Sequence, residues 1–197
     1  MKKNIENYVF VKQNFLDNEF CQNTIEKLNQ LNAWKKHNWV SYNYNQEQQL
    51  DMSSPQGENE PDITSNINIK LDFNDFILEK ISKVIIKYID SLKFEWFNNV
   101  NALTNLKFLK YSPGQTMENH CDHIHEIFDG TKKGIPVFSI IGLLNDDFEG
   151  GNFVMFGDKK INMKEGDLII FPSLFLFPHE VKPITKGIRY SYITWLW

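Results

Sequence analysis

Apolar residues recur every three or four positions over residues 72–92, and charged residues occupy the opposite face. The apolar stripe consists of Phe73, Phe76, Ile77, Ile81, Val84, Ile85, Tyr88, Ile89 and Leu92. This period predicts an amphipathic helix, which we expect to pack against a sheet. A second, shorter stripe follows Asp17, a residue type that caps helix N-termini, and continues to about Asn32. Cys21 lies on that stripe, so we interpret it as a core residue.

Residues 34–44 alternate roughly between apolar and polar side chains, which is typical of a strand. The following residues, 45–66, are mostly polar and include Pro55 and Gly57, which interrupt regular structure. We therefore expect a long surface loop. Long loops in compact domains are either disordered or cover a site, and the pattern leaves both alternatives open.

After about residue 105 the pattern changes to short apolar segments separated by Pro, Gly, Asn and Asp. There are about eight such segments, the last over residues 188–197. Short strands at this spacing favour an antiparallel sandwich or jelly roll over βαβ units. The sequence thus predicts a mainly-β (α+β) fold in which N-terminal helices pack on a β-rich C-terminal half.

The composition fits a single domain over residues 1–197, because a chain of this length with 42% hydrophobic residues can bury a substantial core. We expect residues 1–102 to support a β core formed by residues 103–197. The net charge of −4 disfavours nucleic acid as a partner. Cys21 and Cys121 make no disulfide framework. Because we find neither a signal peptide nor a transmembrane segment, we expect a soluble, cytoplasmic protein.

The candidate chemistry starts at His120 and Asp122, whose side chains would point to the same side of an extended segment. His179, from a distant strand, is the candidate for a third metal ligand. Two histidines and one carboxylate leave three positions open on an octahedral ion, which suits non-haem Fe(II) oxygenases. The alternatives are a surface histidine beside an Asx turn and, for His179, a core histidine satisfied by the backbone.

Nearby residues have other interpretations. His123 and His125 could supply alternative ligands, but the segment up to Pro136 has the composition of a loop, so we expect them to be exposed or to face a substrate. Cys121 should point away from a metal held by its two neighbours. The pair at 150–151, Gly-Gly, predicts a tight hairpin that requires positive φ or a close backbone approach.

Six motifs follow one another over residues 103–197: Tyr-Ser-Pro-Gly-Gln at 111–115, His-Cys-Asp at 120–122, Leu-Leu-Asn at 143–145 with Glu-Gly-Gly-Asn-Phe at 149–153, Gly-Asp-Leu-Ile-Ile-Phe-Pro at 166–172, His-Glu-Val-Lys-Pro at 179–183 and Gly-Ile-Arg-Tyr-Ser at 187–191. In this order they resemble the Fe(II)- and 2-oxoglutarate-dependent dioxygenases, and within them the prolyl 4-hydroxylase-like group. The resemblance implies a double-stranded β-helix (jelly-roll) core with helices on its outer sheet.

The resemblance also implies which residues form the site. It implies iron ligation by His120, Asp122 and His179. It further implies that Arg189 binds the distal carboxylate of 2-oxoglutarate, and a planar guanidinium suits bidentate binding of a carboxylate. The alternative for Arg189 is a structural ion pair with Glu180 or Asp167.

Three further residues concern the co-substrate. Tyr111 matches a tyrosine that borders 2-oxoglutarate in the family, although a tyrosine on a strand can equally be a packing residue. Ser191 would share a strand face with the arginine at position 189. Leu143 departs from the hypoxia-sensing relatives, which carry a tyrosine there, so one hydroxyl contact to the co-substrate would be missing.

The activity implied by the resemblance is hydroxylation of an unactivated C–H bond with O2, releasing succinate and CO2, with ascorbate as an optional reductant. A prolyl residue of a peptide or protein is the first candidate substrate, with loops 45–66 and 123–136 as candidate clamps. A small molecule such as a free amino acid is the alternative. A cupin-like metal or small-ligand binding module on the same barrel is a rival class, but it gives no reason for Arg189. A scaffold without activity is a third, and the intact triad argues against it.

Overall fold

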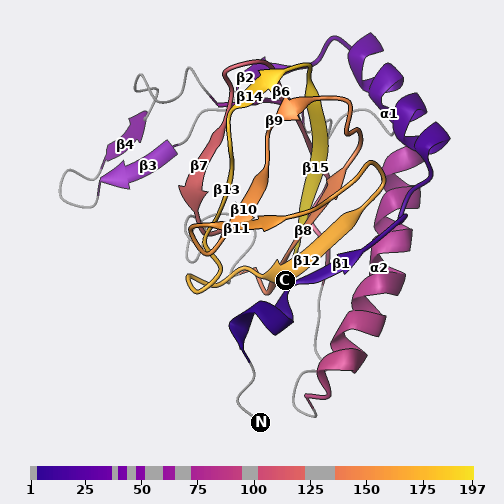
Figure 1. Ribbon diagram of the computed structural model, residues 1–197, viewed down its shortest axis with the longest axis vertical. Helices are drawn as coiled ribbons and strands as arrows, with labels where there is room; N and C mark the ends of the chain where they lie inside the picture. The colour runs from indigo at the N-terminus through magenta and orange to yellow at the C-terminus, as the bar shows by residue number, and fades with distance from the viewer. Residues whose placement is uncertain are drawn as a thin grey trace.

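The computed structural model describes residues 4–36, 40–43, 48–51, 60–64, 72–94, 102–122 and 136–197. Its centre consists of two antiparallel sheets that face each other (Figure 1). In spatial order, the major sheet consists of β1 (Phe10–Lys12), β12 (Leu168–Pro172), β8 (Phe138–Leu143), β15 (Arg189–Leu196), β6 (Lys107–Tyr111), β5 (Asp62–Thr64) and β2 (Lys35–Lys36). The minor sheet consists of β11 (Lys159–Ile161), β10 (Phe153–Met155), β13 (His179–Val181) and β7 (Met117–His120).

Two smaller sheets complete the strands. One pairs β14 (Ile184–Lys186) with β9 (Glu149–Gly150), and the other pairs β3 (Val40–Asn43) with β4 (Gln48–Asp51). This two-layered antiparallel arrangement confirms the predicted jelly-roll class.

Both predicted helices are present and lie outside the major sheet (Figure 1). In α1 (Asn18–Gln30), the Asp17 side chain accepts a hydrogen bond from the Phe20 amide at 2.8 Å, which confirms the predicted N-cap. The second helix, α2 (Asp72–Leu92), has the predicted bounds. Most of its stripe is buried, but Phe76 is 44% exposed at the stripe's edge, where its ring lies against Phe20. A short 3-10 helix, η1 (Ile5–Tyr8), precedes β1.

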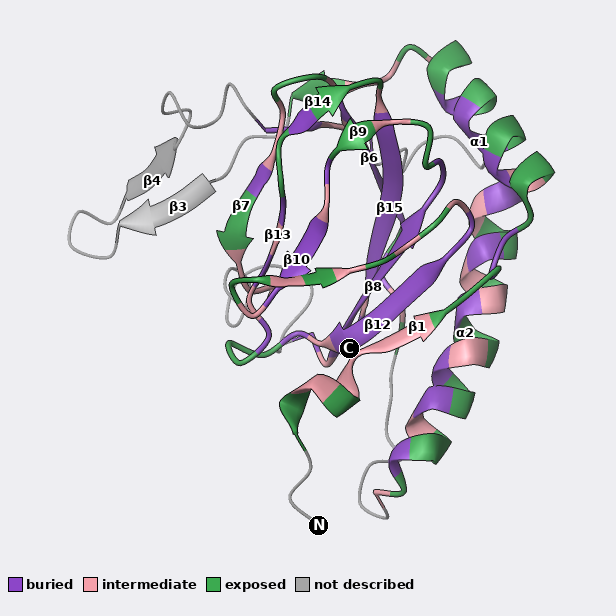
Figure 2. Cartoon of the chain, viewed as in Figure 1, coloured by how far each residue is buried: buried purple, intermediate pink, exposed green. Residues whose placement is uncertain are grey.

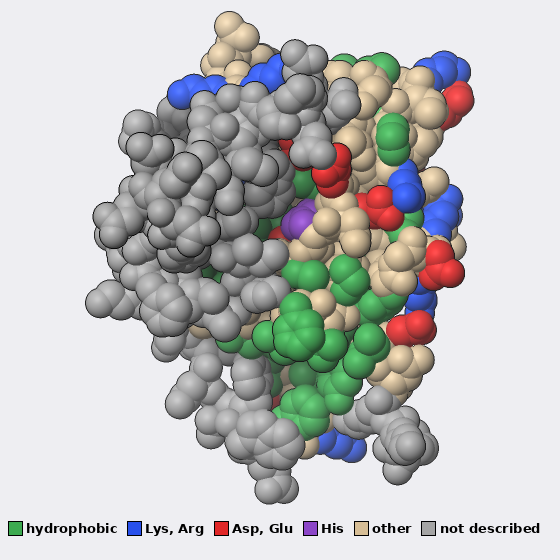
Figure 3. Space-filling view, turned by 90° about the vertical axis from the view of Figure 1, so that its left-hand side faces the viewer, with side chains coloured by type: hydrophobic (Ala, Val, Ile, Leu, Met, Phe, Trp, Pro, Cys, Tyr) green, Lys and Arg blue, Asp and Glu red, His purple; other side chains and the backbone are tan. Residues whose placement is uncertain are grey.

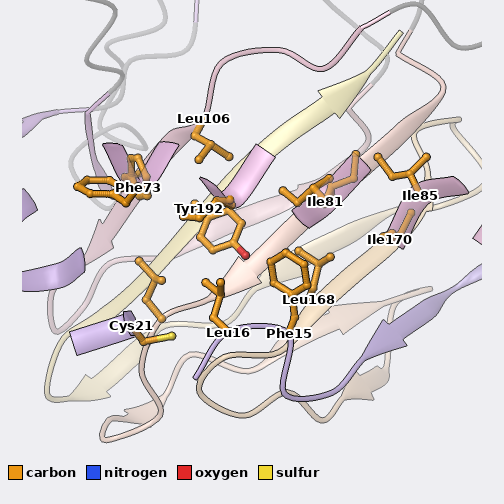
Figure 4. Packing of buried hydrophobic residues seen from close by; sticks show 14 of the residues in the cluster. Phe15, Leu16, Cys21, Phe73, Ile81, Ile85, Leu106, Leu168, Ile170 and Tyr192 are labelled. Carbon is orange, nitrogen blue, oxygen red and sulfur yellow. The ribbon is translucent and has the colours of Figure 1, made fainter. Parts of the chain in front are cut away.

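The major sheet therefore has two buried faces, each with its own apolar cluster. The outer cluster joins the helices to the sheet and includes Cys21, Ile81, Leu168 and Tyr192 (Figure 4). The inner cluster lies between the two sheets. Because both faces are covered, β8 and β15 are buried almost along their whole length (Figure 2).

Cys21 is completely buried, as predicted for a core residue. Burial, with the nearby carboxylates of Glu165 and Asp17 adding to it, raises the pKa of its thiol to about 12. The thiol therefore stays protonated at physiological pH.

The strand predicted over residues 34–44 is wrong in one respect: the described residues form two strands, β2 and β3, in different sheets. The loop expected over residues 45–66 also contains β4 and β5. Backbone pairing with β3 explains β4, because an antiparallel ladder bonds main-chain groups whatever the side chains are. Residues 45–47, 52–59 and 65–66 of the expected loop lie outside the described residues, and so do Trp39 and Tyr44 of the expected strand.

A strand overlaps each of the eight segments predicted in the C-terminal half, although the one expected over residues 175–182 contains only the three residues of β13, and the β9–β14 pair and the N-terminal β1 are additional. Gly150 and Gly151 have φ angles of +79° and +57°, as expected, but they connect strands of different sheets and do not form a hairpin. A Cβ on Gly150 would lie 2.4 Å from the Pro183 carbonyl oxygen, so the close approach is real. In the described part of the chain, no helix has the length and hydropathy needed to cross a membrane.

Candidate metal centre

The three predicted ligands converge at one end of the space between the sheets. His120 ends β7 and pairs directly with His179, the first residue of β13, while Asp122 follows β7. The Asp122 Oδ1 atom lies 3.4 Å from His120 Nε2 and 3.6 Å from His179 Nε2. One ligand atom from each of the three residues lies within 4.8 Å of the others, a spacing that allows one metal ion to contact all three.

The two imidazoles are held by their other nitrogen. His120 Nδ1 lies 2.7 Å from the Glu118 carbonyl oxygen, and His179 Nδ1 lies 3.1 Å from that of Phe177. A carbonyl oxygen only accepts, so each Nδ1 carries the hydrogen and each Nε2 keeps its lone pair. This is the orientation that metal-binding histidines adopt.

The carboxylate of Asp122 is fixed in the same way. Its Oδ2 accepts hydrogen bonds from Ser139 Oγ at 2.5 Å and from Trp195 Nε1 at 3.0 Å. Ser139 Oγ in turn lies 2.8 Å from Ser173 Oγ, and both hydroxyls are buried. The network leaves Oδ1 facing the two histidines, so Asp122 presents one oxygen to a metal.

The charges at the centre suit a cation. Burial alone would raise the pKa of Asp122, but its contacts with His120, His179 and the Ser139 hydroxyl outweigh burial and hold that pKa far below its usual range. Burial lowers the pKa of His179, although the Asp122 carboxylate opposes the shift. Burial would also lower the pKa of His120, but its contact with Asp122 raises it. An ionised carboxylate and a neutral His179 are the forms that ligate metals.

A cavity of about 230 Å³ extends from this centre between the two sheets. Its lining is mostly apolar and includes Leu109, Met117, Ile141, Phe153, Val181, Ile193 and Trp195. The His120 side chain is 18% exposed, so the centre has access to solvent, and Figure 3 shows a histidine at the surface between acidic side chains above and apolar side chains below. An apolar cavity with few polar groups is typical of a small-molecule site.

The largest polar group in the lining is Arg189, which is only 2% exposed. Its Nη1 donates to Ser191 Oγ at 2.8 Å, and its guanidinium carbon lies 5.1 Å from the centre of the Tyr111 ring. Burial lowers the pKa of the guanidinium, which Tyr111 partly offsets, and burial raises the pKa of Tyr111 to about 12. All three residues line the cavity, as expected from their shared strand faces.

The structural alternative for Arg189 is not found. Asp167 accepts hydrogen bonds from the Asn14 and Lys164 amides, and Glu180 pairs with Lys182. Among the residues that the structure describes, no carboxylate pairs with the Arg189 guanidinium. A buried charge without a counter-charge is costly, so its position indicates an anion that binds in the cavity.

The remaining predictions have mixed outcomes. Leu143 pairs with Ser191 in the sheet, so the departure from the tyrosine of hypoxia-sensing relatives falls beside the predicted co-substrate residues. Cys121 is not among the converging donors, and its thiol donates to the Phe175 carbonyl at 3.4 Å, although the residue borders the cavity. His123, His125 and loop 123–135 lie outside the described residues.

Sequence reasoning missed Ser139, Trp195 and Lys107, which also belong to the site. The alternation along the last strand could have placed Trp195 on the same face as Arg189. Placing Ser139 in the site would have required knowledge of how β8 pairs with β12 and β15, and no local sequence pattern predicts that pairing.

The comparisons with known proteins agree with this geometry. Residues 106–197 match the family model of the 2OG-Fe(II) oxygenase superfamily. A PKHD-type hydroxylase of Delftia acidovorans is 32% identical over 97 residues, which is 45% of this chain and 41% of the relative. The chain thus matches about two-fifths of the length of this curated relative.

Solved structures extend the likeness to nearly the whole fold. The viral collagen prolyl hydroxylase of Paramecium Bursaria Chlorella virus-1, in its 2OG complex, superposes with a TM-score of 0.67 at 17% identity, covering 96% of this chain and 94% of that one. A Trichoplax adhaerens prolyl hydroxylase, in complex with a hypoxia inducible factor peptide fragment, gives 0.66 at 17% identity, covering 97% and 84%. The resemblance seen in the sequence is thereby confirmed, and the fold is that of the prolyl hydroxylases.

Proposed function

We propose that this protein, which resembles the prolyl 4-hydroxylase-like 2OG-Fe(II) oxygenases, is an Fe(II)- and 2-oxoglutarate-dependent dioxygenase. It would hydroxylate an unactivated C–H bond and release succinate and CO2. The observation that carries the proposal is the buried Arg189, which lines the same cavity as the converging His120, Asp122 and His179. A metal centre and an anion site in one cavity are what this chemistry requires. A cupin-like binding module would need no such arginine.

The residues present fit the iron. Two imidazole nitrogens and one carboxylate oxygen suit Fe(II) and leave coordination positions for other ligands. The hydrogen bonds of the ligands to Glu118, Phe177 and Ser139 orient them before any ion binds. His120, Asp122 and His179 would therefore hold the metal.

Arg189 would hold the distal carboxylate of 2-oxoglutarate. Its planar guanidinium can form two parallel hydrogen bonds, and its burial strengthens them. The hydroxyl of Ser191 and the ring of Tyr111 fix the direction of that fork. The apolar lining around it excludes water from the co-substrate.

When bound, iron and 2-oxoglutarate supply the oxidation: decarboxylation of the co-substrate delivers one atom of O2 to succinate and the other to the substrate carbon. The chain's contribution is ligand geometry, the clamp on the co-substrate and a dry cavity. No side-chain acid or base is needed.

For the substrate, we propose a prolyl residue of a peptide or protein. The proposal is supported by the shared fold with prolyl hydroxylases, one of them solved with a peptide fragment. The segments 45–66 and 123–136 are the proposed peptide clamps, and a soluble, cytoplasmic location is part of the same proposal.

The test starts without oxygen. Purified protein, Fe(II) and 2-oxoglutarate should give a weak visible metal-to-ligand charge-transfer band, and admitting O2 should then yield succinate. Ascorbate should increase the yield in the same assay. Absence of both band and succinate would favour a binding module.

A second assay addresses the substrate. Peptides, free amino acids and nucleotides are screened for stimulated succinate release together with a mass gain of one oxygen. If the prolyl proposal is right, a peptide library without proline is inert. Stimulation by a free amino acid alone would instead assign a small-molecule oxygenase.

A further inference from the structure

Strand β6 carries two lysines on opposite faces. Lys107 shares the cavity face with Leu109 and Tyr111, whereas Lys110 points to the outer side, where its Nζ lies 5.8 Å from the centre of the Trp34 ring. Lys107 is exposed and also lines the cavity, which places it at the cavity's mouth. Lys110 is half-buried.

Lys107 is connected to the metal centre through one indole. Its Nζ lies 5.0 Å from the centre of the Trp195 ring, within the range of a cation–π interaction. The Nε1 of the same indole donates to Asp122 Oδ2 at 3.0 Å. The Trp195 indole thus contacts both the Lys107 ammonium group and the metal ligand Asp122.

The cavity has a second cation at a different depth. In the sheet register, Arg189 faces Tyr111, while Lys107 faces Ile193, four residues further along β15. Four residues of strand correspond to about 13 Å. Arg189 is therefore deep in the cavity, and Lys107 lies toward the solvent.

Within the described part of the chain, no carboxylate pairs with the Lys107 ammonium group, whose contact is the Trp195 ring. Among the described residues that line the cavity, Asp122, the metal ligand, is the only anionic side chain. In the proposed function, the distal carboxylate of 2-oxoglutarate would bind to Arg189. A cation, an indole and apolar neighbours at the mouth remain available to the primary substrate.

We propose that Lys107 and Trp195 form a subsite for a carboxylate carried by the primary substrate close to the carbon that is hydroxylated. The proposal rests on the proposed function and assigns a specificity-determining residue to it. The carboxylate belongs either to an acidic residue next to the target in a peptide or to a free acid. Charges at the rim of a site mainly steer association, so the subsite should act on KM and on Kd more than on kcat.

The experiment compares matched probes. Proline peptides with Glu on either side of the proline are each paired with the Gln peptide, and L-proline is paired with prolinamide as the free-acid arm. Binding to the protein with Fe(II) and 2-oxoglutarate is measured by calorimetry without O2. Because no turnover is needed, the result is separate from the succinate assay that tests the oxygenase itself.

In the wild type, the acidic member of at least one pair should bind more tightly, by up to about fivefold. Lys107→Met should abolish the preference, and Lys107→Glu should reverse it. Lys110→Glu is the matched control, because it changes the same charge on the same strand but outside the cavity, and it should keep the preference. Salt should weaken the preference, since the ammonium group is exposed.

The arm that shows the preference identifies the source of the carboxylate. Equal binding within every pair, failure of all the acidic probes to bind, or a preference that survives Lys107→Glu would each overturn the subsite. A preference without succinate release would keep the subsite and reject the oxygenase.

Discussion

The two faces of the major sheet are both buried, but they are built in different ways. Its outer face packs apolar side chains against α1 and α2, with Ile81 and Tyr192 at the centre (Figure 4). Its inner face buries charged and polar groups, among them Arg189, Ser139 and Ser191. The packing of the outer face stabilises the strands. This stabilisation offsets the cost of burying charged and polar groups on the inner face, where they form a preorganised site.

The sharpest test of the inner face is His179→Ala. The side chain supplies one of three ligand atoms, so iron should no longer be retained after gel filtration. The fold should persist, because the helices and the outer cluster are untouched. Metal analysis and far-UV circular dichroism measure the two outcomes, and a variant that keeps iron would contradict the assigned ligand set.

Arg189→Ala should raise the 2-oxoglutarate requirement steeply, since losing one partner of a buried charged pair costs on the order of 2 to 5 kcal/mol. Stability should not fall correspondingly, because the guanidinium has no described carboxylate partner to lose. Titration of succinate release against 2-oxoglutarate measures the change. An unchanged requirement would move the co-substrate clamp to another residue.

On the outer face, Ile81→Ala should lower the free energy of unfolding by about 2 to 5 kcal/mol, because Ile81 is completely buried and leaves a cavity. Iron affinity of the folded protein should stay at the wild-type value. Urea unfolding and metal titration together test the separation of the faces. A parallel loss of iron affinity would show that the two faces are coupled.

Ser139→Ala should weaken metal binding by about 10- to 100-fold, the usual effect of removing a group that orients a ligand. Trp195 would still donate to Asp122, so the loss should be partial. Ser173→Ala is the graded control, because it acts only through Ser139 and should cost less. Equal effects of both variants would argue against the chain of hydrogen bonds.

The smallest effect at neutral pH concerns Cys21 on the outer face, because it appears only at alkaline pH. Because burial raises the pKa of Cys21 from 9.0 to about 12, the unfolded chain loses this proton first as pH rises. The contribution of Cys21 to the free energy of unfolding is fully present below pH 9. It is lost between pH 9 and about 12, by up to about 1.4 kcal/mol per pH unit. Urea unfolding across this range should show a shallower decline in Cys21→Ala, and an unchanged slope would reject the assignment.

Local patterns predicted what local interactions determine. The helix over residues 72–92 and the cap at Asp17 follow from periodicity and side-chain chemistry, and the alternation of the last strand placed Arg189 and Ser191 on one face. Alternation placed His120 and Asp122 on one side of a segment, the resemblance implied that they bind iron together with His179, and the geometry brings the three together.

The sequence could not predict contacts that depend on distant pairing. Strand β4 has a single apolar residue, Leu50, so its ladder with β3 leaves no alternating hydrophobic pattern. The bond from Ser139 to Asp122 forms only when the two sheets face each other, and the contact of Lys107 with Trp195 requires the pairing of β6 with β15. Such contacts are set by the register between strands and not by any single stretch of residues.

The pairing of β1 with β12 has a consequence for how the chain folds. The Asn14 amide bonds to the carboxylate of Asp167, which is 153 residues away, and Leu16 bonds to the backbone of Gly166 nearby. During synthesis the N-terminal segment therefore cannot form these hydrogen bonds until nearly the whole chain has been made. Contacts of such long sequence separation slow folding, so closure of this strand should be a late event.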